Sequence, residues 1–178
     1  MFKKDQKEKR KQELLHHLLE DPTQGTNKIA QKTRMNRRTI FQMQKDLEED
    51  QAIWGYTTVL NERKLKRVVY LLQFKTKPFT KEFADLIFKR LTTHEPEKHG
   101  VRMLDICYAN SVYDVLVIYS APSHEIARQY FEVLRAVYRD HFLNEPLVSQ
   151  INNYFVKNGK LNPNLKRILN NLIPKIPK

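Results

Sequence analysis

The sequence predicts an α+β fold with a helical first part, a middle of strands and helices, and a short helical end. Apolar residues recur at helical spacing up to about residue 50, and then alternate in short runs across residues 68–157. Apolar residues make up 40% of the chain and aromatic residues 10%, which excludes a disordered chain. The 178 residues suffice for one large domain or two small ones, each with a modest core.

The first part of the chain is expected to hold three helices. They are assigned to residues 5–20, 27–32 and 37–50, with a turn at residues 33–36. The first helix ends at Asp21-Pro22, because the residue before a proline avoids the helical region. Its apolar stripe consists of four leucines: Leu14, Leu15, Leu18 and Leu19. Ile29 and Ala30 are the expected core contacts of the second helix.

The third helix begins after Asn36, whose side-chain oxygen can accept a hydrogen bond from an exposed N–H group of the first turn. Ile40, Met43 and Leu47 recur at i, i+3 and i+7, so they form one buried stripe. The other faces then carry a polar and cationic set: Arg37, Arg38, Thr39, Gln42 and Lys45.

Residues 52–61 are expected to form a pair of strands. Ile53, Tyr56 and Val59 nearly alternate with polar residues, as in a half-buried hairpin. Two helices joined by a short turn and followed by such a hairpin make a winged helix-turn-helix, which we assign to residues 1–62.

The middle of the chain has the order strand, helix, strand, strand, helix, strand. The strands are expected at residues 68–76, 103–109, 115–120 and 147–157, and the helices at 81–91 and 123–139. Ser123 can cap the second of these helices, and Asn110-Ser111 lies at a tight turn between the middle strands. The order βαββαβ is the ferredoxin-like arrangement, which we assign to residues 67–158.

The basic tail, residues 159–178, is expected to hold one more helix. Asn162 can cap it, and Pro163 suits its first position. Its apolar stripe consists of Leu165, Ile168, Leu169, Leu172 and Ile173. A helix of about 11 residues is marginal alone, so this stripe must pack against something. Three alternatives remain: its own domain, a second subunit, or a DNA contact that uses the tail cations.

The cationic face of the third helix has residue types that suit the major groove of DNA. Arginine can donate two parallel hydrogen bonds to guanine and glutamine can bind adenine, while lysine and threonine suit phosphates or single base contacts. Trp54 and Thr57 in the expected wing are candidates for the DNA backbone, although Trp54 could equally pack within the hairpin. The alternative for the helix itself is a solvated surface, which the winged helix-turn-helix context disfavours.

The net charge of +12 is concentrated at the two ends of the chain. Residues 1–66 carry 15 Lys/Arg and 10 Asp/Glu, residues 67–157 carry 12 and 10, and residues 158–178 carry 5 and none. This distribution favours polyanion contacts at the ends and a different role for the middle. No apolar run approaches the roughly 18–20 residues that span a bilayer, so no membrane partner is expected.

Other chemistry finds little support in the sequence. Cys107 is alone, so it forms no internal disulfide, and its alternating apolar run predicts a buried side chain. The charged start lacks a secretory signal, and we expect a cytoplasmic protein. His94, Glu95, Glu97 and His99 do not match the spacing of a closed metal site. We therefore expect no metal, no cofactor and no catalytic residues.

Residues 53–61, the run Ile-Trp-Gly-Tyr-Thr-Thr-Val-Leu-Asn, resemble the junction between the two domains of a known family. With Ile29-Ala30, residues 36–49 and Leu65, they resemble the leucine-responsive regulatory protein/AsnC (Lrp/AsnC) family of prokaryotic transcription regulators. That resemblance implies a sequence-specific regulator that binds double-stranded DNA. It also implies a homodimer or higher homo-oligomer formed through a ferredoxin-like domain of the RAM type, and an amino-acid effector.

Three positions depart from the family pattern, which has glycine where this chain has Ser111, Arg34 and Gln51. The resemblance places an effector site near Ser111, Tyr113 and Asp114, and a side chain at Ser111 can block or alter that site. At Arg34 and Gln51 the missing glycines predict a turn and an entrance to the wing with altered shapes.

Two other functions remain as alternatives. Sirohaem decarboxylases resemble this two-domain layout, but their pattern of His and Arg residues is not found here. A non-specific architectural DNA-binding protein would use the basic ends without contacting bases.

Overall fold

A computed structural model of the chain describes residues 2–174, with side chains from Asp5 onward. The chain forms two compact units. The first runs up to Val59 and includes Asn158–Lys160, and the second comprises Leu60–Lys157 together with the chain from Leu161 on. No helix within residues 2–174 is both long enough and apolar enough to cross a membrane.

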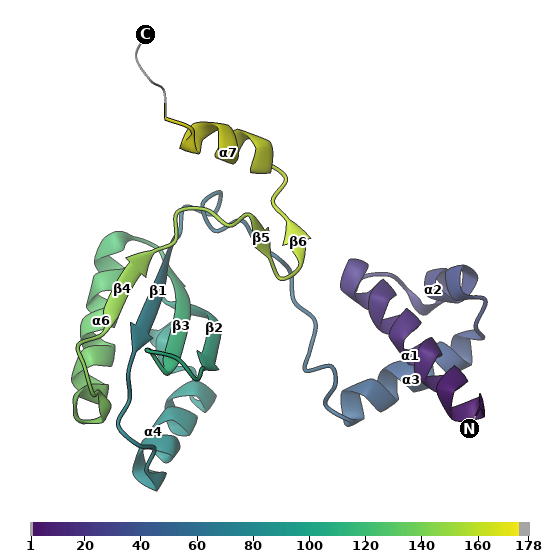
Figure 1. Cartoon of the computed structure of the whole chain (residues 1–178), viewed down its shortest axis with the longest axis horizontal. Helices are drawn as coiled ribbons and strands as arrows, with labels where there is room; N and C mark the ends of the chain where they lie inside the picture. Colours follow the sequence, from purple (N-terminus) through teal and green to yellow (C-terminus); the bar gives the residue numbers. More distant parts are fainter. Residues whose placement is uncertain (1, 175–178) are drawn as a thin grey trace. The chain divides into compact units, whose positions relative to one another are not determined.

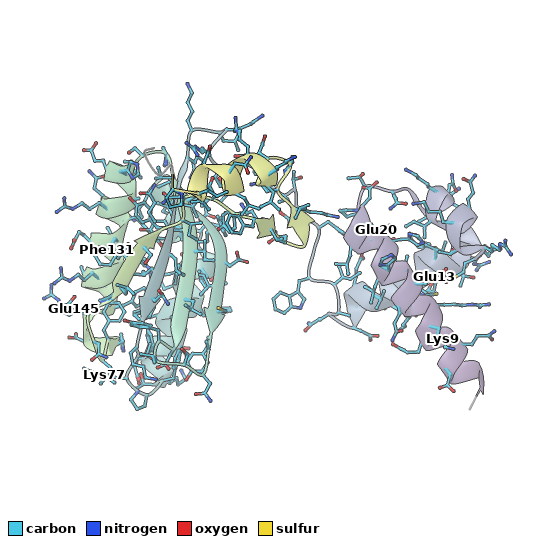
Figure 2. The ribbon with its side chains drawn as sticks, turned by 45° about the horizontal axis from the view of Figure 1, so that its top comes forward. Lys9, Glu13, Glu20, Lys77, Phe131 and Glu145 are labelled. Carbon is cyan, nitrogen blue, oxygen red and sulfur yellow. The ribbon has the colours of Figure 1, made fainter. Side chains whose placement is uncertain are left out.

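The first unit is built from three helices, which the sequence predicted. They are α1 (Phe2–Glu20), α2 (Thr26–Thr33) and α3 (Arg37–Glu49). Their core consists of Leu14, Leu18, Ile29, Met35, Ile40, Met43 and Leu47. Lys9, Glu13 and Glu20 are exposed on α1 (Figure 2). Leu19 was expected in the core but is 75% exposed, because the buried stripe of α1 is narrower than its run of leucines.

The expected strand pair at residues 52–61 is not formed. The chain is extended there but belongs to neither of the described sheets. Ile53 packs against the helical core, whereas Trp54 is 97% exposed. Of the two alternatives for Trp54, packing within the hairpin is therefore wrong, and contact with DNA stays a prediction. A hairpin needs a turn that returns the chain on itself, and this segment instead continues directly into the second unit.

The second unit contains a four-stranded antiparallel sheet. Its strands are β1 (Val68–Phe74), β2 (Arg102–Tyr108), β3 (Val115–Ala121) and β4 (Leu147–Gln150), in the spatial order β2-β3-β1-β4 (Figure 1). In the register of the central pair, Leu72 lies opposite Val117. A bulge between Met103 and Asp105 interrupts the pairing of β2 with β3. This is the predicted ferredoxin-like arrangement.

Helices connect these strands. They are α4 (Lys81–Thr92), the short α5 (Glu95–Lys98) and α6 (His124–Tyr138), followed by the 3-10 turn η1 (Arg139–His141). The side chain of Ser123 accepts from the N–H of Ile126 at 3.2 Å, as predicted. Thr80 caps α4 in the same way, accepting from the N–H of Phe83 at 3.2 Å. Neither the Thr80 cap nor α5 was predicted from the sequence.

One face of the sheet packs on helices α4 and α6. The core between them includes Leu72, Phe74, Phe83, Val101, Val117, Tyr119, Tyr130 and Leu134. Cys107 was expected to be buried but is exposed. It is paired with Leu116 in the register, so it lies on the opposite face of the sheet from its neighbour Ile106. The alternation of apolar residues along this strand predicted correctly which residues share a face of the sheet. It did not predict which face is covered by helices.

The end of the described chain differs from the prediction in two ways. The expected strand at residues 147–157 is broken: β4 ends at Gln150, and β5 (Val156–Lys157) pairs instead with β6 (Lys160–Leu161). The tail helix is α7 (Leu165–Leu172), as expected, but none of its residues is buried. Its apolar stripe therefore does not pack in the core of its own domain.

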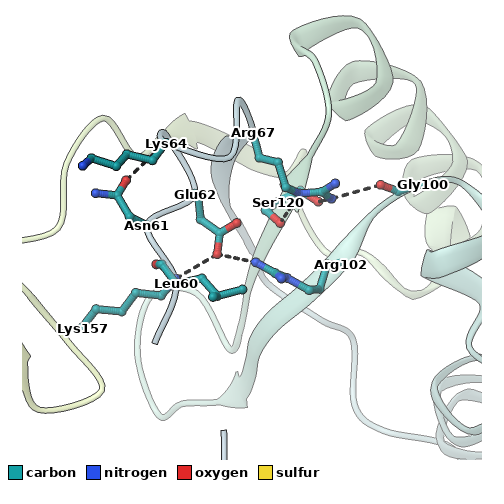
Figure 3. A network of polar contacts seen from close by, with 9 residues as sticks. All are labelled: Leu60, Asn61, Glu62, Lys64, Arg67, Gly100, Arg102, Ser120 and Lys157. Carbon is teal, nitrogen blue, oxygen red and sulfur yellow. Dashed lines mark hydrogen bonds and ion pairs between the residues drawn. The ribbon is translucent and has the colours of Figure 1, made fainter. Parts of the chain in front are cut away.

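A buried ion cluster holds the segment that leads into β1 (Figure 3). The Glu62 side chain is only 4% exposed and pairs with Arg102 at 2.5 Å and with Lys157 at 3.1 Å. Nearby, Arg67 donates to the backbone oxygens of Gly100 at 3.1 Å and Ser120 at 2.9 Å. These contacts join the linker, the edge of the sheet and β5 within one unit.

Candidate nucleic-acid interface

The start of α3 is fixed by the cap that the sequence predicted. The backbone of Asn36 is extended, and its Oδ1 accepts from the N–H of Arg38 at 2.8 Å. Ile40, Met43 and Leu47 are all less than 5% exposed, so they anchor α3 on the core of the first unit. This anchoring determines which α3 side chains face outward.

Three of the predicted DNA-binding residues share one outward ridge of α3. Arg38, Gln42 and Lys45 are exposed and stand at i, i+4 and i+7. Phe41 lies at i+3 on the same ridge and is 62% exposed. Phe41 was not predicted as a contact residue, although its spacing from Ile40 and Met43 already places it off the buried stripe. An aromatic side chain at this position suits contact with a thymine methyl group.

The other predicted residues lie on the flanks of this ridge. Arg37 and Thr39 are exposed in the first turn, on opposite sides of Arg38. Asn36 uses its side-chain oxygen in the cap, so its main role in the structure is to begin the helix. The structure therefore separates the predicted set into a ridge, two flanking residues and a cap.

Partners within α3 restrain only the second half of the ridge. Gln42 donates to Asp46 at 2.8 Å, and Lys45 pairs with Glu49 at 3.3 Å. Within residues 5–174, the guanidinium groups of Arg37 and Arg38 take part in no hydrogen bond or ion pair. These two groups can therefore reach a polyanion without first breaking a protein contact.

The charge order along α3 is the reverse of what stabilises an isolated helix. The partial positive charge at a helix N-terminus favours acidic residues there, and the C-terminus favours basic residues. Here the first turn has no acidic residue and two arginines, the last turn has no basic residue, and Glu48 and Glu49 stand at the end. Arginines and the helix dipole thus concentrate positive charge at one end of α3, as a phosphate site requires.

The turns around α3 keep the backbone shape that glycine would adopt. Arg34 and Gln51 have φ values of 55° and 57°, in the left-handed region. Both positions thus adopt the left-handed backbone that favours glycine, and the predicted change in the shape of the turn and of the entrance to the wing stays a prediction. The chain accepts the local strain of a left-handed non-glycine residue at both places.

The chain after α3 is tied back to that helix. Gln44 donates to the hydroxyl of Tyr56 at 2.8 Å, and the hydroxyl donates to Glu48 at 2.8 Å. Burial, and then the hydrogen bond to Glu48, raise the pKa of Tyr56. Thr57 and Trp54 flank this anchored residue and are exposed, so they can contact a ligand of the first unit.

The predicted effector residues lie in the loop between β2 and β3. Asp114 is buried, and its carboxylate accepts from Lys75 Nζ at 2.6 Å and from the N–H and hydroxyl of Thr76 at 3.3 Å. The hydrogen bond from Lys75 holds the pKa of Asp114 below its ordinary value. Ser111 is exposed and is not among the non-glycine residues with positive φ in the described chain.

Metal-binding groups do not gather in the part of the chain that the structure describes. Within it, no three His, Cys, Asp or Glu side chains are close enough together to hold an ion. Within the polar run at residues 94–99, Glu95–Lys98 form α5, where Lys98 and Glu95 pair at 2.5 Å.

The fold occurs in solved structures of transcription regulators. An AsnC family regulator from Agrobacterium tumefaciens superposes with a TM-score of 0.62 at 15% identity, over 92% of this chain and 97% of that one. The Mycobacterium tuberculosis leucine response regulatory protein superposes with a TM-score of 0.65 at 13% identity, over 86% and 97%. This chain has the Lrp/AsnC fold.

A regulator from Neisseria meningitidis, solved as a complex with L-Met, has a TM-score of 0.60 at 12% identity, over 82% of this chain and 89% of that one. No protein-family model and no curated protein sequence matches the chain. The Lrp/AsnC fold thus agrees with the family resemblance found in residues 53–61. The agreement comes from the superposed structures, because the overall sequence identity is low.

Proposed function

We propose that the protein is a sequence-specific regulator of transcription that binds double-stranded DNA. The observation that carries this proposal is the reversed charge order of α3. The arginines at its N-terminus have no ion pair among the described residues, and they stand beside an outward ridge of base-contacting residue types. A helix that gives up dipole stabilisation in this way suits a polyanionic ligand. The regulators with the same fold support the same function.

In this proposal α3 is the recognition helix. Arg38, Gln42 and Lys45 contact bases or phosphates in the major groove, with Phe41 between them. Arg37 and Thr39 contact the flanking phosphates, and the Asn36 cap holds the first turn in place. Trp54 and Thr57 add contacts to the DNA backbone.

The proposed active form is a homodimer that joins through the ferredoxin-like sheet. The face of the sheet away from α4 and α6 carries Leu71, Leu116 and Ile118, which are half-buried and belong to neither of the described cores. A second copy of the chain that packed on this face would remove its apolar surface from water, and this burial would stabilise the dimer. A dimer would also place two recognition helices on DNA half-sites about one helical turn apart, or a multiple of it.

The proposal includes a small-molecule effector that binds near Ser111 and Tyr113. Because Asp114 is committed to Lys75 and Thr76, an effector at the loop would have to contact Ser111 and Tyr113 instead. L-methionine is the first compound to test, since a regulator with this fold was solved with it. Replacement by the family glycine, Ser111→Gly, should strengthen any such binding if the serine side chain obstructs it.

In vitro selection from random duplexes, followed by anisotropy titrations at several salt concentrations, tests the main proposal. The expected result is a palindromic motif that binds about 10³-fold or more tightly than random DNA. Tight, strongly salt-dependent binding without an enriched motif would contradict base recognition and favour an architectural protein.

A further inference from the structure

The helix α7 has an apolar stripe that nothing in its own unit covers. Leu169, Leu172 and Ile173 are between 43% and 64% exposed, and none of the helix residues is buried. Leu165 and Ile168 are half-buried but belong to neither of the described cores. A helix of eight residues is not stable by itself in water, so its stripe requires a surface to pack on.

The chain just before α7 extends this apolar surface. Phe155, Val156 and Leu161 are between 45% and 65% exposed. Residues 155–173, which we call the tail arm, thus expose six large apolar side chains. Folded monomers rarely leave large apolar patches in contact with water, and such patches mark protein–protein interfaces.

The start of α7 is held in place within the second unit. The backbone N–H of Asn162 donates to the carbonyl oxygen of Phe155 at 2.9 Å, and its side-chain amide donates to that of Tyr154 at 2.7 Å. The side-chain oxygen of Asn162 accepts from the N–H of Asn164 at 2.9 Å, directly before the helix. The apolar stripe is therefore presented from a defined place beside residues 154 and 155.

This place borders the open face of the sheet, by which we mean the face away from α4 and α6. In the strand register Arg102 lies opposite Ser120, whose side chain shares the open face with Ile118. Glu62 pairs both with Arg102 and with Lys157 of the tail arm (Figure 3). The tail arm therefore starts at one end of the open face.

The open face alone offers a small apolar contact to a second copy of the chain. Leu71, Leu116 and Ile118 are half-buried, whereas Val69 and Ser120 at one end of this face are already covered. A stable interface buries about 800 Å² on each partner. Three half-buried side chains supply only a small part of that area, so a stable dimer through this face needs further apolar contacts beside it.

We propose that the tail arm packs on a second copy of the chain, with the apolar stripe of α7 against the partner at the border of the open face. This inference rests on the proposed homodimer and adds a second contact to it. Two-fold symmetry makes each copy both give and receive a tail arm. Lys166 and Arg167 stand outside the stripe and remain in water, whereas a DNA contact through these cations would leave the stripe uncovered.

Sedimentation equilibrium of the full-length protein at constant salt tests this contact. Leu169→Lys combined with Leu172→Lys should raise the dimer dissociation constant at least tenfold, because it places two charges in the apolar stripe. The control, Asn170→Lys combined with Asn171→Lys, adds the same charge to the polar face of α7 and should change the constant less than threefold. Equal effects of the two pairs would overturn the proposal.

Ile118→Lys in the open face separates the tail contact from the homodimer itself. It should also weaken the dimer, since it disrupts the sheet contact. If Ile118→Lys dissociates the dimer and the α7 leucine pair does not, the homodimer stands and the tail contact is refuted. If the unchanged protein is monomeric at every concentration, the homodimer and the tail contact both fail.

Paramagnetic relaxation shows directly which molecule α7 contacts. A spin label on Asn171→Cys, in a Cys107→Ser background, is placed on one copy and mixed with methyl-labelled protein that carries no spin label. We expect broadening of methyl signals of the unlabelled copy near its open face, such as those of Leu116 and Ile118. Broadening that occurs only when both labels are on one molecule would show that α7 packs on its own chain, and would overturn the proposal.

Discussion

The charged side chains of α3 and those around Glu62 are used in opposite ways. At Glu62 one buried carboxylate pairs with two cations, Arg102 and Lys157, inside the second unit. On α3, Arg37 and Arg38 are exposed and make no ion pair among the described residues. The first arrangement uses its charges to hold the fold together, and the second leaves them available for a ligand. The two sets should therefore respond differently to mutation.

Glu62→Gln should produce the largest loss of stability. It leaves Arg102 and Lys157 without their negative partner in a mostly buried place, and we expect a loss of about 2–3 kcal/mol of unfolding free energy. The lower end applies if Arg102, whose side chain is 38% exposed, becomes rehydrated. Urea unfolding followed by circular dichroism measures the change. Glu125→Gln on the exposed surface of α6 is the matched control and should cost little.

Arg38→Ala should weaken DNA binding and leave the stability nearly unchanged. We expect cognate DNA binding to weaken by about 1–3 kcal/mol if Arg38 contacts a guanine, with a change in stability of less than about 0.5 kcal/mol. Anisotropy titration measures the binding, with Arg128→Ala on α6 as the control for loss of one positive charge. Equal weakening on cognate and random DNA would assign Arg38 to a phosphate instead.

Asn36→Ala should affect both properties, since the cap holds the helix and the helix presents the arginines. Loss of the hydrogen bond to the N–H of Arg38 should cost about 1 kcal/mol of stability and weaken DNA binding as well. Asn36→Ser keeps a capping oxygen and should recover most of both losses. If Asn36→Ala left the thermal unfolding midpoint unchanged, the assigned role of the cap would be wrong.

Gln51→Gly should give the smallest effect, and a favourable one. Gln51 has a φ of 57°, so glycine relieves strain there but adds freedom to the unfolded chain. The net gain should be about 0.5 kcal/mol, measurable by urea unfolding. Gln31→Gly, within helix α2, is the matched control and should lose about 1 kcal/mol. A loss at both positions would mean that Gln51 carries no relievable strain.

The sequence was sufficient to predict those features that depend on interactions between residues close together in the chain. The caps at Asn36 and Ser123 depend on bonds within three residues, and the stripe of Ile40, Met43 and Leu47 depends only on helix periodicity. These local rules gave the order of elements in both units and most of the candidate interface.

Sequence was insufficient where distant parts of the chain decide the outcome. Residues 52–61 alternate as a strand does, but no partner strand is present in the described chain. Cys107 alternates as a buried residue does, but its face of the sheet is not the one that packs on helices. Phe41 is apolar yet exposed, because the position on α3 and not the residue type determines its direction. The pairing of Glu62 with residues 40 and 95 positions away carries no local signal.

The most direct test of the central claim is to repeat the in vitro selection with Arg38→Ala and compare its enriched motif with that of the unchanged protein. If the outward ridge of α3 contacts bases, the preference for guanine at one position of each half-site should disappear while the rest of the motif remains. An unchanged motif with uniformly weaker binding would contradict base recognition by Arg38, and would leave α3 as a helix that contacts only the DNA backbone.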